Sequence, residues 1–212
     1  MSSARIQRVV VGELESNCWL VGDGADGPLL VIDPGSEPER VLDAIGGRPV
    51  AAVVLTHGHF DHIGGASDVV AETGAPLFVH EADAERLEDP DLNGGAAFGY
   101  FVTAPGPARL LADGDVVEAG ALSLDVIETP GHTPGSICLF ARDVGDLFCG
   151  DTLFRGSVGR TDFPGGDPRA LRESIARLAS LPASTVAHPG HGPDTTLEFE
   201  ARANPFWPRS RD

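Results

Sequence analysis

The sequence contains no lysine, and all fifteen of its cationic side chains are arginines, against 32 aspartates and glutamates. A P-loop nucleotide site and Schiff-base chemistry both require a lysine, so these two classes of enzyme are excluded. The formal net charge is −17 at pH 7. Because nucleic acids and anionic membrane surfaces bind clustered cations, we expect neither as a partner of this chain.

Cysteines and long hydrophobic runs are also scarce. Cys18, Cys138 and Cys149 form an odd set without a C-x-x-C spacing, which indicates neither a disulfide framework nor a zinc knuckle and predicts reduced, buried thiols. No apolar run is long enough to span a bilayer, and the apolar run within residues 1–11 is too short for a secretory signal. The expected location is therefore the cytoplasm.

The 212 residues are expected to form a single domain over residues 1–212, because 42% hydrophobic and 22% charged side chains are ordinary for a globular protein. Up to Glu88, short apolar strands alternate with segments of helical periodicity. From Asp113 onward, short strands separated by Gly and Pro turns predominate. This pattern predicts the α/β class with a second sheet in the C-terminal half.

Two segments connect these halves. The segment from Glu81 to Glu88 has the composition of an acidic helix, and its simplest interpretation is a solvated face. The stretch from Asp89 to Pro107 has no periodicity and reads as a long loop that could cover a site. Its aromatic residues Phe98, Tyr100 and Phe101 are expected to form either a lid or a packed loop.

Four side chains that can bind a metal occur within one short segment, Thr56-His57-Gly58-His59-Phe60-Asp61-His62. The segment follows the apolar run from Val50 to Leu55, so it lies at the end of a predicted strand. Imidazole binds zinc, iron and similar ions, and a carboxylate can complete or bridge such a site. The segment therefore predicts a metal site.

Three further residues stand at the same kind of position, where a strand ends and Gly or Pro turns the chain. Strand ends in a layered α/β domain can converge on one rim. This gives seven predicted ligands, which is more than one tetrahedral ion needs. The number therefore favours two adjacent metal ions roughly 3.5–4 Å apart. The seven candidates are His57, His59, Asp61, His62, His132, Asp151 and His191.

Four motifs, T-H-x-H-x-D-H, P-G-H-T-P-G-S, G-D-T-L-F and P-G-H-G-P, occur in this order along the chain. They resemble those of the metallo-β-lactamase fold hydrolases and, within them, of the glyoxalase II-like thioesterases. The resemblance implies a four-layer αββα sandwich with a metal site at one edge of the two sheets. It also implies two divalent ions, zinc first, with iron or manganese as alternatives. By similarity, the first ion binds His57, His59 and His132, the second binds Asp61, His62 and His191, and Asp151 bridges them.

The same resemblance implies a small-molecule thioester as the substrate, either S-lactoylglutathione or a related acyl-thiol ester, cleaved by a metal-activated hydroxide. Asp61 is then a catalytic residue as well as a ligand. Arg160 stands where glyoxalase II has a substrate-binding lysine and is expected to bind a substrate carboxylate or carbonyl. Glyoxalase II enzymes add a C-terminal helical domain that helps to hold glutathione; none is apparent after His191, so the thiol carrier stays open. A monomer or a homodimer is expected.

Two other functions compete with the thioesterase. Persulfide dioxygenases of the same fold use a single iron and share a Gly-Arg-Thr-Asp-Phe segment, here residues 159–163. The motif around His191 favours the hydrolases, because the dioxygenases are expected to have Pro-Ala-His-Asp-Tyr there. A metal-binding protein without catalytic activity is the third alternative. A serine nucleophile is not indicated, since no G-x-S-x-G elbow surrounds Ser136 or Ser157.

Four other polar residues are interpreted as structural. His80 follows an apolar strand and is expected to have a satisfied hydrogen bond, while His188 is expected to lie beside the site without binding metal. Strand alternation places Cys149 in the core. Asp162 is expected to pair with a nearby arginine or to cap a turn.

Overall fold

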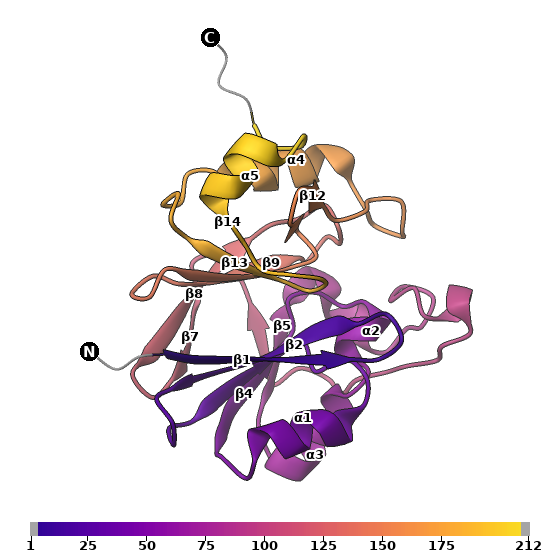
Figure 1. Cartoon of the computed structure of the whole chain (residues 1–212). Coiled ribbons are helices and arrows are strands. Elements are labelled where there is room, and N and C mark those ends of the chain that lie inside the picture. Colours follow the sequence, from indigo (N-terminus) through magenta and orange to yellow (C-terminus); the bar gives the residue numbers. More distant parts are fainter. Residues whose placement is uncertain (1–3, 209–212) are drawn as a thin grey trace.

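A computed structural model describes residues 4–208 of the chain (Figure 1). The first of its two large sheets has the strand order β1-β2-β3-β4-β5-β6, antiparallel from β1 to β3 and parallel from β3 to β6. Its strands are β1 (Ala4–Val11), β2 (Ser16–Asp23), β3 (Leu29–Ile32), β4 (Val50–Val54), β5 (Leu77–His80) and β6 (Arg109–Leu111).

The second large sheet has the strand order β14-β13-β10-β9-β8-β7, in which only the β10–β13 pair is parallel. Its strands are β7 (Val116–Ala119), β8 (Leu122–Glu128), β9 (Ile137–Ala141), β10 (Asp146–Gly150), β13 (Val186–Pro189) and β14 (Thr195–Thr196). A separate hairpin pairs β11 (Leu153–Phe154) with β12 (Ser157–Val158).

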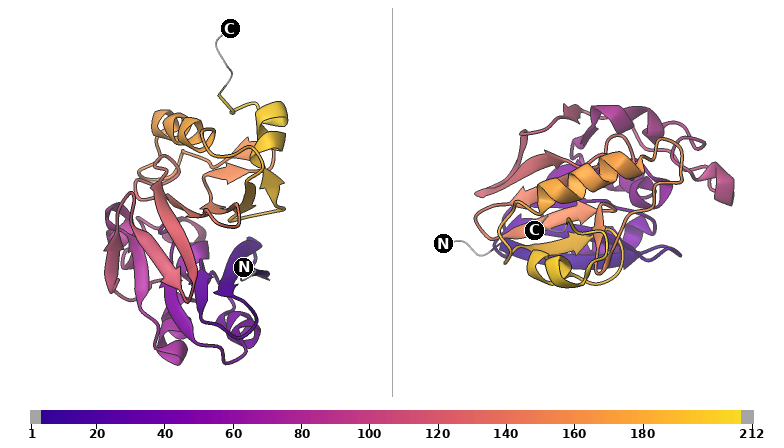
Figure 2. Two further views of the ribbon diagram at one scale, coloured as in Figure 1. Left: turned by 90° about the vertical axis from the view of Figure 1, so that its left-hand side faces the viewer. Right: turned by 90° about the horizontal axis from the view of Figure 1, so that it is seen from above.

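Helices cover the outer faces of the two sheets (Figures 1 and 2). Those on the first sheet are α1 (Pro38–Ile45) and α3 (Ala66–Thr73), and those on the second are α4 (Pro168–Leu178) and α5 (Leu197–Ala203). The short helices are α2 (Phe60–Ile63) and the 3₁₀ segments η1 (Glu81–Leu87) and η2 (Ala96–Phe98). The order of layers is thus helix, sheet, sheet, helix, as the sequence predicts.

Strand alternation explains why both sheets are covered on both faces. In β3, Leu29 and Val31 pack with the core under α1 and α3, whereas Leu30 and Ile32 pack with the core between the sheets. Successive side chains of a strand point to opposite faces, so a continuous apolar run is what a strand with two buried faces requires. Strand β9 behaves likewise, with Ile137 between the sheets and Cys138 and Phe140 under the second helical layer.

Local signals set the start of α4. Asp167 accepts hydrogen bonds from the backbone N–H groups of Arg169 and Ala170 at 2.7 and 3.1 Å, and Pro168 occupies the first turn. An N-cap aspartate followed by proline satisfies the free N–H groups and presets the backbone, so the helix begins at this point. Within residues 4–208, no helix has both the length and the apolar character that crossing a bilayer requires.

One segment differs from its prediction. The segment Glu81–Leu87 forms a 3₁₀ helix, and the interpretation of this stretch as a solvated acidic face is wrong, because Asp83, Arg86 and Leu87 are buried. The composition of an acidic segment does not reveal which of its carboxylates will be buried and hydrogen-bonded. The Asp83 carboxylate accepts hydrogen bonds from four buried residues, which are described with the metal centre below.

Candidate metal centre

The seven candidate ligands converge at one edge of the two sheets, although they come from four separate strand ends. His57 follows β4, and His59 begins the short helix α2 that carries Asp61 and His62. The other three follow strands of the second sheet, His132 after β8, Asp151 after β10 and His191 after β13. We refer to these seven residues as the cluster.

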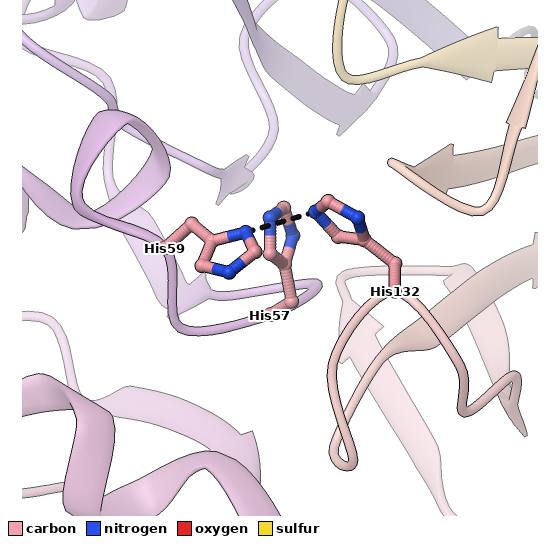
Figure 3. A group of neighbouring side chains, drawn as sticks. All are labelled: His57, His59 and His132. Atoms are coloured by element: carbon pink, nitrogen blue, oxygen red, sulfur yellow. Dashed lines mark hydrogen bonds between the residues drawn. The ribbon is translucent and has the colours of Figure 1, made fainter. Parts of the chain in front are cut away.

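Three histidines form the first group of the cluster. One ligand atom each of His57, His59 and His132 lies within 4.8 Å of the other two, and the three rings point toward one another (Figure 3). His59 Nδ1 and His132 Nε2 are 2.8 Å apart. All three side chains are buried, so a positive ion among them would be shielded from water.

Asp61, His62 and His191 form the second group, again with ligand atoms within 4.8 Å of one another. His191 Nε2 lies 3.1 Å from Asp61 Oδ2 and 3.3 Å from His62 Nε2. This group is less enclosed, because the His191 side chain is 27% exposed whereas that of His62 is fully buried. The second group is therefore the more exposed of the two.

Asp151 lies between the two groups. Its Oδ2 is 3.5 Å from His132 Nε2 in the first group, and its Oδ1 is 3.4 Å from His62 Nε2 in the second. The residue before His191 must be glycine here, since a Cβ on Gly190 would lie 2.2 Å from Asp151 Oδ1. The Asp151 carboxylate thus contacts histidines of both groups.

A buried carboxylate behind the cluster, Asp33, orients two of its histidines. Asp33 accepts hydrogen bonds from His62 Nδ1 at 3.0 Å and from the Thr56 hydroxyl at 2.6 Å, and Thr56 Oγ1 lies 3.0 Å from His57 Nδ1. Because the threonine proton points to Asp33, its oxygen accepts from His57. Both imidazoles therefore carry their proton on Nδ1 and leave Nε2 free toward the cluster.

Backbone carbonyls orient two further histidines in the same way. His132 Nδ1 lies 2.8 Å from the Arg160 carbonyl oxygen, and His191 Nδ1 lies 3.0 Å from that of Leu14. An imidazole that donates from Nδ1 to a carbonyl presents an unprotonated Nε2 on its other side. Four of the five histidines are thus held in the tautomer that metal binding through Nε2 requires.

The donor atoms that remain fit a metal ion. Three buried atoms of the cluster, His57 Nε2, His59 Nε2 and Asp151 Oδ1, have no hydrogen-bond partner among the described residues. Burial and the neighbouring imidazoles hold the pKa of His57 and that of His59 well below the usual range, so both rings are neutral at pH 7. Buried neutral imidazoles with unpaired nitrogens are what a divalent cation binds.

The second group attracts positive charge. Burial lowers the pKa of His62, but the Asp61 and Asp151 carboxylates outweigh it and raise that pKa to about 10. The pKa of His191 is also raised, since the Asp61 and Asp151 carboxylates outweigh its burial. Acidic groups that stabilise a proton on a buried imidazole would equally stabilise a metal cation in its place.

Asp83 of η1 holds two ligand-bearing loops together, and no sequence signal indicated it. Its carboxylate accepts hydrogen bonds from Gly58 N at 2.8 Å, between two cluster histidines, and from Thr133 Oγ1 at 2.6 Å and Gly135 N at 2.8 Å, just after His132. A fourth bond comes from buried Arg86, at 3.1 Å. Asp83 thereby connects the two chain segments that supply the first group.

A pocket of about 950 Å³ opens over the cluster. Phe98 and Tyr100, from the loop between Asp89 and Pro107, contribute to its wall, whereas Phe101 of the same loop is 77% exposed and does not line the pocket. Tyr100 stacks on Phe60 at 5.1 Å between ring centres, and its hydroxyl donates to Glu13 at 2.8 Å. The cluster residues that line the pocket are His59, Asp61, His132, Asp151 and His191.

Residues 11–191 match the family model of the metallo-beta-lactamase superfamily. The chain belongs to this superfamily. Among curated members, it is 38% identical to the probable metallo-hydrolase YqgX of Bacillus subtilis, over 94% of this chain and 96% of that protein. It is 32% identical to the hydroxyacylglutathione hydrolase GloC of Haemophilus influenzae, over 95% of this chain and 97% of that protein.

Solved structures of the superfamily superimpose on nearly the whole chain. The BLEG-1 B3 metallo-beta-lactamase has a TM-score of 0.91 with 34% identity, covering 95% of this chain and 99% of that one. TTHA1623, solved in a di-iron-bound form, has a TM-score of 0.85 with 42% identity, covering 94% and 99%. The protein is therefore a metallo-hydrolase superfamily member, and its His/Asp cluster is the metal-binding cluster typical of the metallo-β-lactamase fold.

The polar residues interpreted as structural lie outside the cluster of this metallo-β-lactamase fold. His80 Nε2 bonds to Glu128 at 2.9 Å, and His188 Nε2 bonds to Asp146 at 2.9 Å. Cys149 is fully buried, as predicted from strand alternation. The interpretations of His80 and Cys149 are confirmed by these findings.

Proposed function

We propose that this metallo-β-lactamase superfamily member hydrolyses acyl thioesters with two divalent metal ions, and that S-lactoylglutathione is the first substrate to test. The observation that carries the proposal is the sharing of Asp151 by two groups of ligands beneath one pocket. The likeness to GloC, which is described as a hydroxyacylglutathione hydrolase, supports the choice of substrate.

In this proposal His57, His59 and His132 would hold one ion, Asp61, His62 and His191 would hold the second, and Asp151 would be shared by both groups. Zinc is the first candidate, and iron and manganese are alternatives; the di-iron form of TTHA1623 supports both the number of ions and the iron alternative. Two such ions would lower the pKa of water toward neutrality and withdraw electron density from a substrate carbonyl.

Asp61 orients the attacking group. Its Oδ2 accepts a hydrogen bond from the Ser16 hydroxyl at 3.0 Å, which holds the carboxylate in place, and lies 3.1 Å from His191 Nε2, another member of the second group. Burial raises the pKa of Asp61, but His62 and His191 outweigh it and hold that pKa well below the usual range. A carboxylate that stays ionised accepts hydrogen bonds and does not act as a proton store.

The pocket favours thioesters over amides or alkyl esters. Only two of the residues that line it carry a carboxylate, Asp61 and Asp151, and both belong to the cluster. Among residues 4–208, no other side-chain carboxylic acid lines the pocket wall to protonate a leaving group. A thiolate, whose conjugate acid has a pKa of about 8.5, leaves without such help, whereas an amine or alkoxide does not.

Arg160 is proposed to bind the substrate carbonyl. The side chain lines the pocket, and two of its nitrogens donate to Asp162, at 2.7 Å each, which is the arginine partner expected for that aspartate. Because Asp162 neutralises the guanidinium charge, the remaining nitrogen suits a neutral acceptor better than an anion. Arg160→Ala should then raise KM more than it lowers kcat.

Metal quantification combined with three assays tests the proposal. About two metal equivalents per chain and hydrolysis of S-lactoylglutathione are expected. One iron per chain with oxygen uptake on glutathione persulfide would establish the dioxygenase alternative instead. Bound metal without turnover on either substrate would support a non-catalytic role. A β-lactam serves as the third substrate, because BLEG-1 is described as a metallo-beta-lactamase, and preferential β-lactam cleavage would contradict the thioesterase proposal.

A further inference from the structure

Within residues 4–208, two arginines line the pocket, and they differ in whether their charge is already neutralised. The guanidinium of Arg160 is paired with Asp162 and lies 3.9 Å from the centre of the Phe163 ring. Arg155 has no carboxylate partner within residues 4–208, and its guanidinium lies 4.8 Å from the centre of the Phe199 ring. A cation whose charge is left unpaired beside a pocket is a site for an anionic group.

The fold holds Arg155 at a defined position. Arg155 and Gly156 form the two-residue turn of the β11–β12 hairpin, and the Gly156 φ of 74° is the left-handed conformation that such turns use. Gly156 N donates to the buried Glu200 at 2.9 Å, and the Asn204 side chain donates to the Ser157 carbonyl at 2.9 Å. Helix α5 and the residue after it therefore fix the tip of the hairpin, which lowers the entropic cost of binding there.

The same hairpin connects the cluster to Arg155. Phe154 precedes Arg155, and its ring centre lies 6.2 Å from that of His191 in the cluster. Much of the remaining pocket wall is apolar, including Leu14, Val158 and Phe163. A ligand that reaches from the cluster to Arg155 therefore passes an apolar wall and ends at a positive charge.

We propose that Arg155 binds a carboxylate at the far end of the substrate, and that preferred substrates are thioesters with an apolar or aromatic body ending in a carboxylate. The identity of the cleaved bond rests on the proposed function, whereas the anion site does not. The carboxylate belongs either to the thiol part or to the acyl part of the thioester, and both arrangements present the same group to the guanidinium.

Equilibrium binding of a thioether that cannot be hydrolysed tests the anion site without turnover. The probes are S-benzyl-3-mercaptopropionic acid and its methyl ester, measured by calorimetry on the metal-loaded protein. The wild type should bind the acid about tenfold more tightly than the ester, the ratio for one charge-assisted hydrogen bond. Arg155→Gln should abolish this preference, and Arg155→Lys should keep part of it, because lysine retains the charge without the planar fork.

The matched control is Arg202→Gln, which removes the same charge from α5 at an arginine paired with Glu198. This variant should keep the tenfold preference, because Arg202 does not line the pocket. Equal binding of acid and ester by the wild type, or an unchanged preference in Arg155→Gln, would overturn the anion site. The latter result would mean that the carboxylate binds elsewhere, for example at the metal ions.

Turnover then identifies which part of the substrate carries the carboxylate. The thiol arm compares S-phenylacetyl-3-mercaptopropionic acid with its methyl ester, and the acyl arm compares S-phenyl monothioglutarate with its methyl ester. In one arm, Arg155→Gln should raise KM for the acid about tenfold and leave the ester unchanged. If no thioester is cleaved while binding of the thioether acid still depends on Arg155, the proposed function fails and the anion site stands. If thioesters are cleaved while neither turnover nor binding of the thioether acid depends on Arg155, the anion site fails and the proposed function stands.

Discussion

The floor and the mouth of the pocket are built in opposite ways. The floor is the cluster, whose histidines are mostly buried and held from behind by hydrogen bonds to Asp33 and to backbone carbonyls. The mouth consists of aromatic side chains such as Phe98, 56% exposed, and of Arg155 on a hairpin turn. The polar groups of the floor are held in fixed positions, as a reaction step common to all substrates requires. The exposed apolar side chains of the mouth contact the variable part of a substrate and can therefore select among substrates. Changes at the floor should therefore alter metal content and kcat, and changes at the mouth should alter KM alone.

The largest effect is expected from removing a ligand of the floor. His132→Ala should lower kcat/KM by more than about 100-fold, the upper value for residues that only support a metal ligand, and should reduce the metal content. Thioesterase assays and metal analysis measure both losses. The matched control is His80→Ala, because His80 lies outside the cluster and is hydrogen-bonded to Glu128. This variant should retain the metal content of the wild type. A fully metallated, active His132→Ala protein would remove this histidine from the site.

Asp33 ranks next, because it orients two ligands without belonging to either group. Asp33→Ala should weaken metal affinity or activity by about 10–100-fold, since His62 and Thr56 lose the acceptor that sets their orientation. Chelator competition measures the affinity. Asp33→Asn retains an oxygen that can accept one of the bonds and should fall between the wild type and Asp33→Ala. Equal metal affinity in all three proteins would show that the ring orientations are held by other contacts.

Asp83 should affect stability more than chemistry. Asp83→Ala leaves Arg86 as an unpaired buried charge and should reduce the free energy of unfolding by about 3–5 kcal/mol, measured by urea denaturation. At a low temperature at which Asp83→Ala is still folded, it should retain the substrate selectivity of the wild type, because Asp83 does not line the pocket. A matched surface pair is Arg169–Glu173, where Glu173→Ala should cost about 1 kcal/mol or less. Similar losses at both sites would contradict the role assigned to Asp83.

The smallest effect is expected at the mouth. Tyr100→Phe removes the hydroxyl that donates to Glu13 but keeps the ring stacked on Phe60. Because this hydrogen bond is exposed to solvent, KM should change by less than about fivefold, with kcat and metal content unchanged. Steady-state kinetics measure this change. A large fall in kcat would show that the mouth takes part in the chemistry, and the separation between floor and mouth would no longer hold.

The sequence identifies the floor better than the mouth because metal ligands are restricted to a few residue types at strand ends. The seven candidates lie together in the structure for this reason. Asp33 also follows a strand, β3, so the same strand-end rule applied to every strand would have found it. Asp83 had no such signal, since it lies in an acidic segment whose composition is typical of a solvent-exposed helix.

The alternation of apolar residues by itself predicted an α/β protein with a second sheet, and residue types at strand ends predicted a metal site, because residue type and strand periodicity are local properties; the four layers followed from the resemblance of four ordered motifs to a known family. Tertiary structure alone decided the rest. Whether a carboxylate is buried, as Asp83 is, depends on loops that meet far from one another in the chain. The difference between paired Arg160 and unpaired Arg155 likewise depends on which side chains the fold places beside each guanidinium, and in the sequence both are simply arginines.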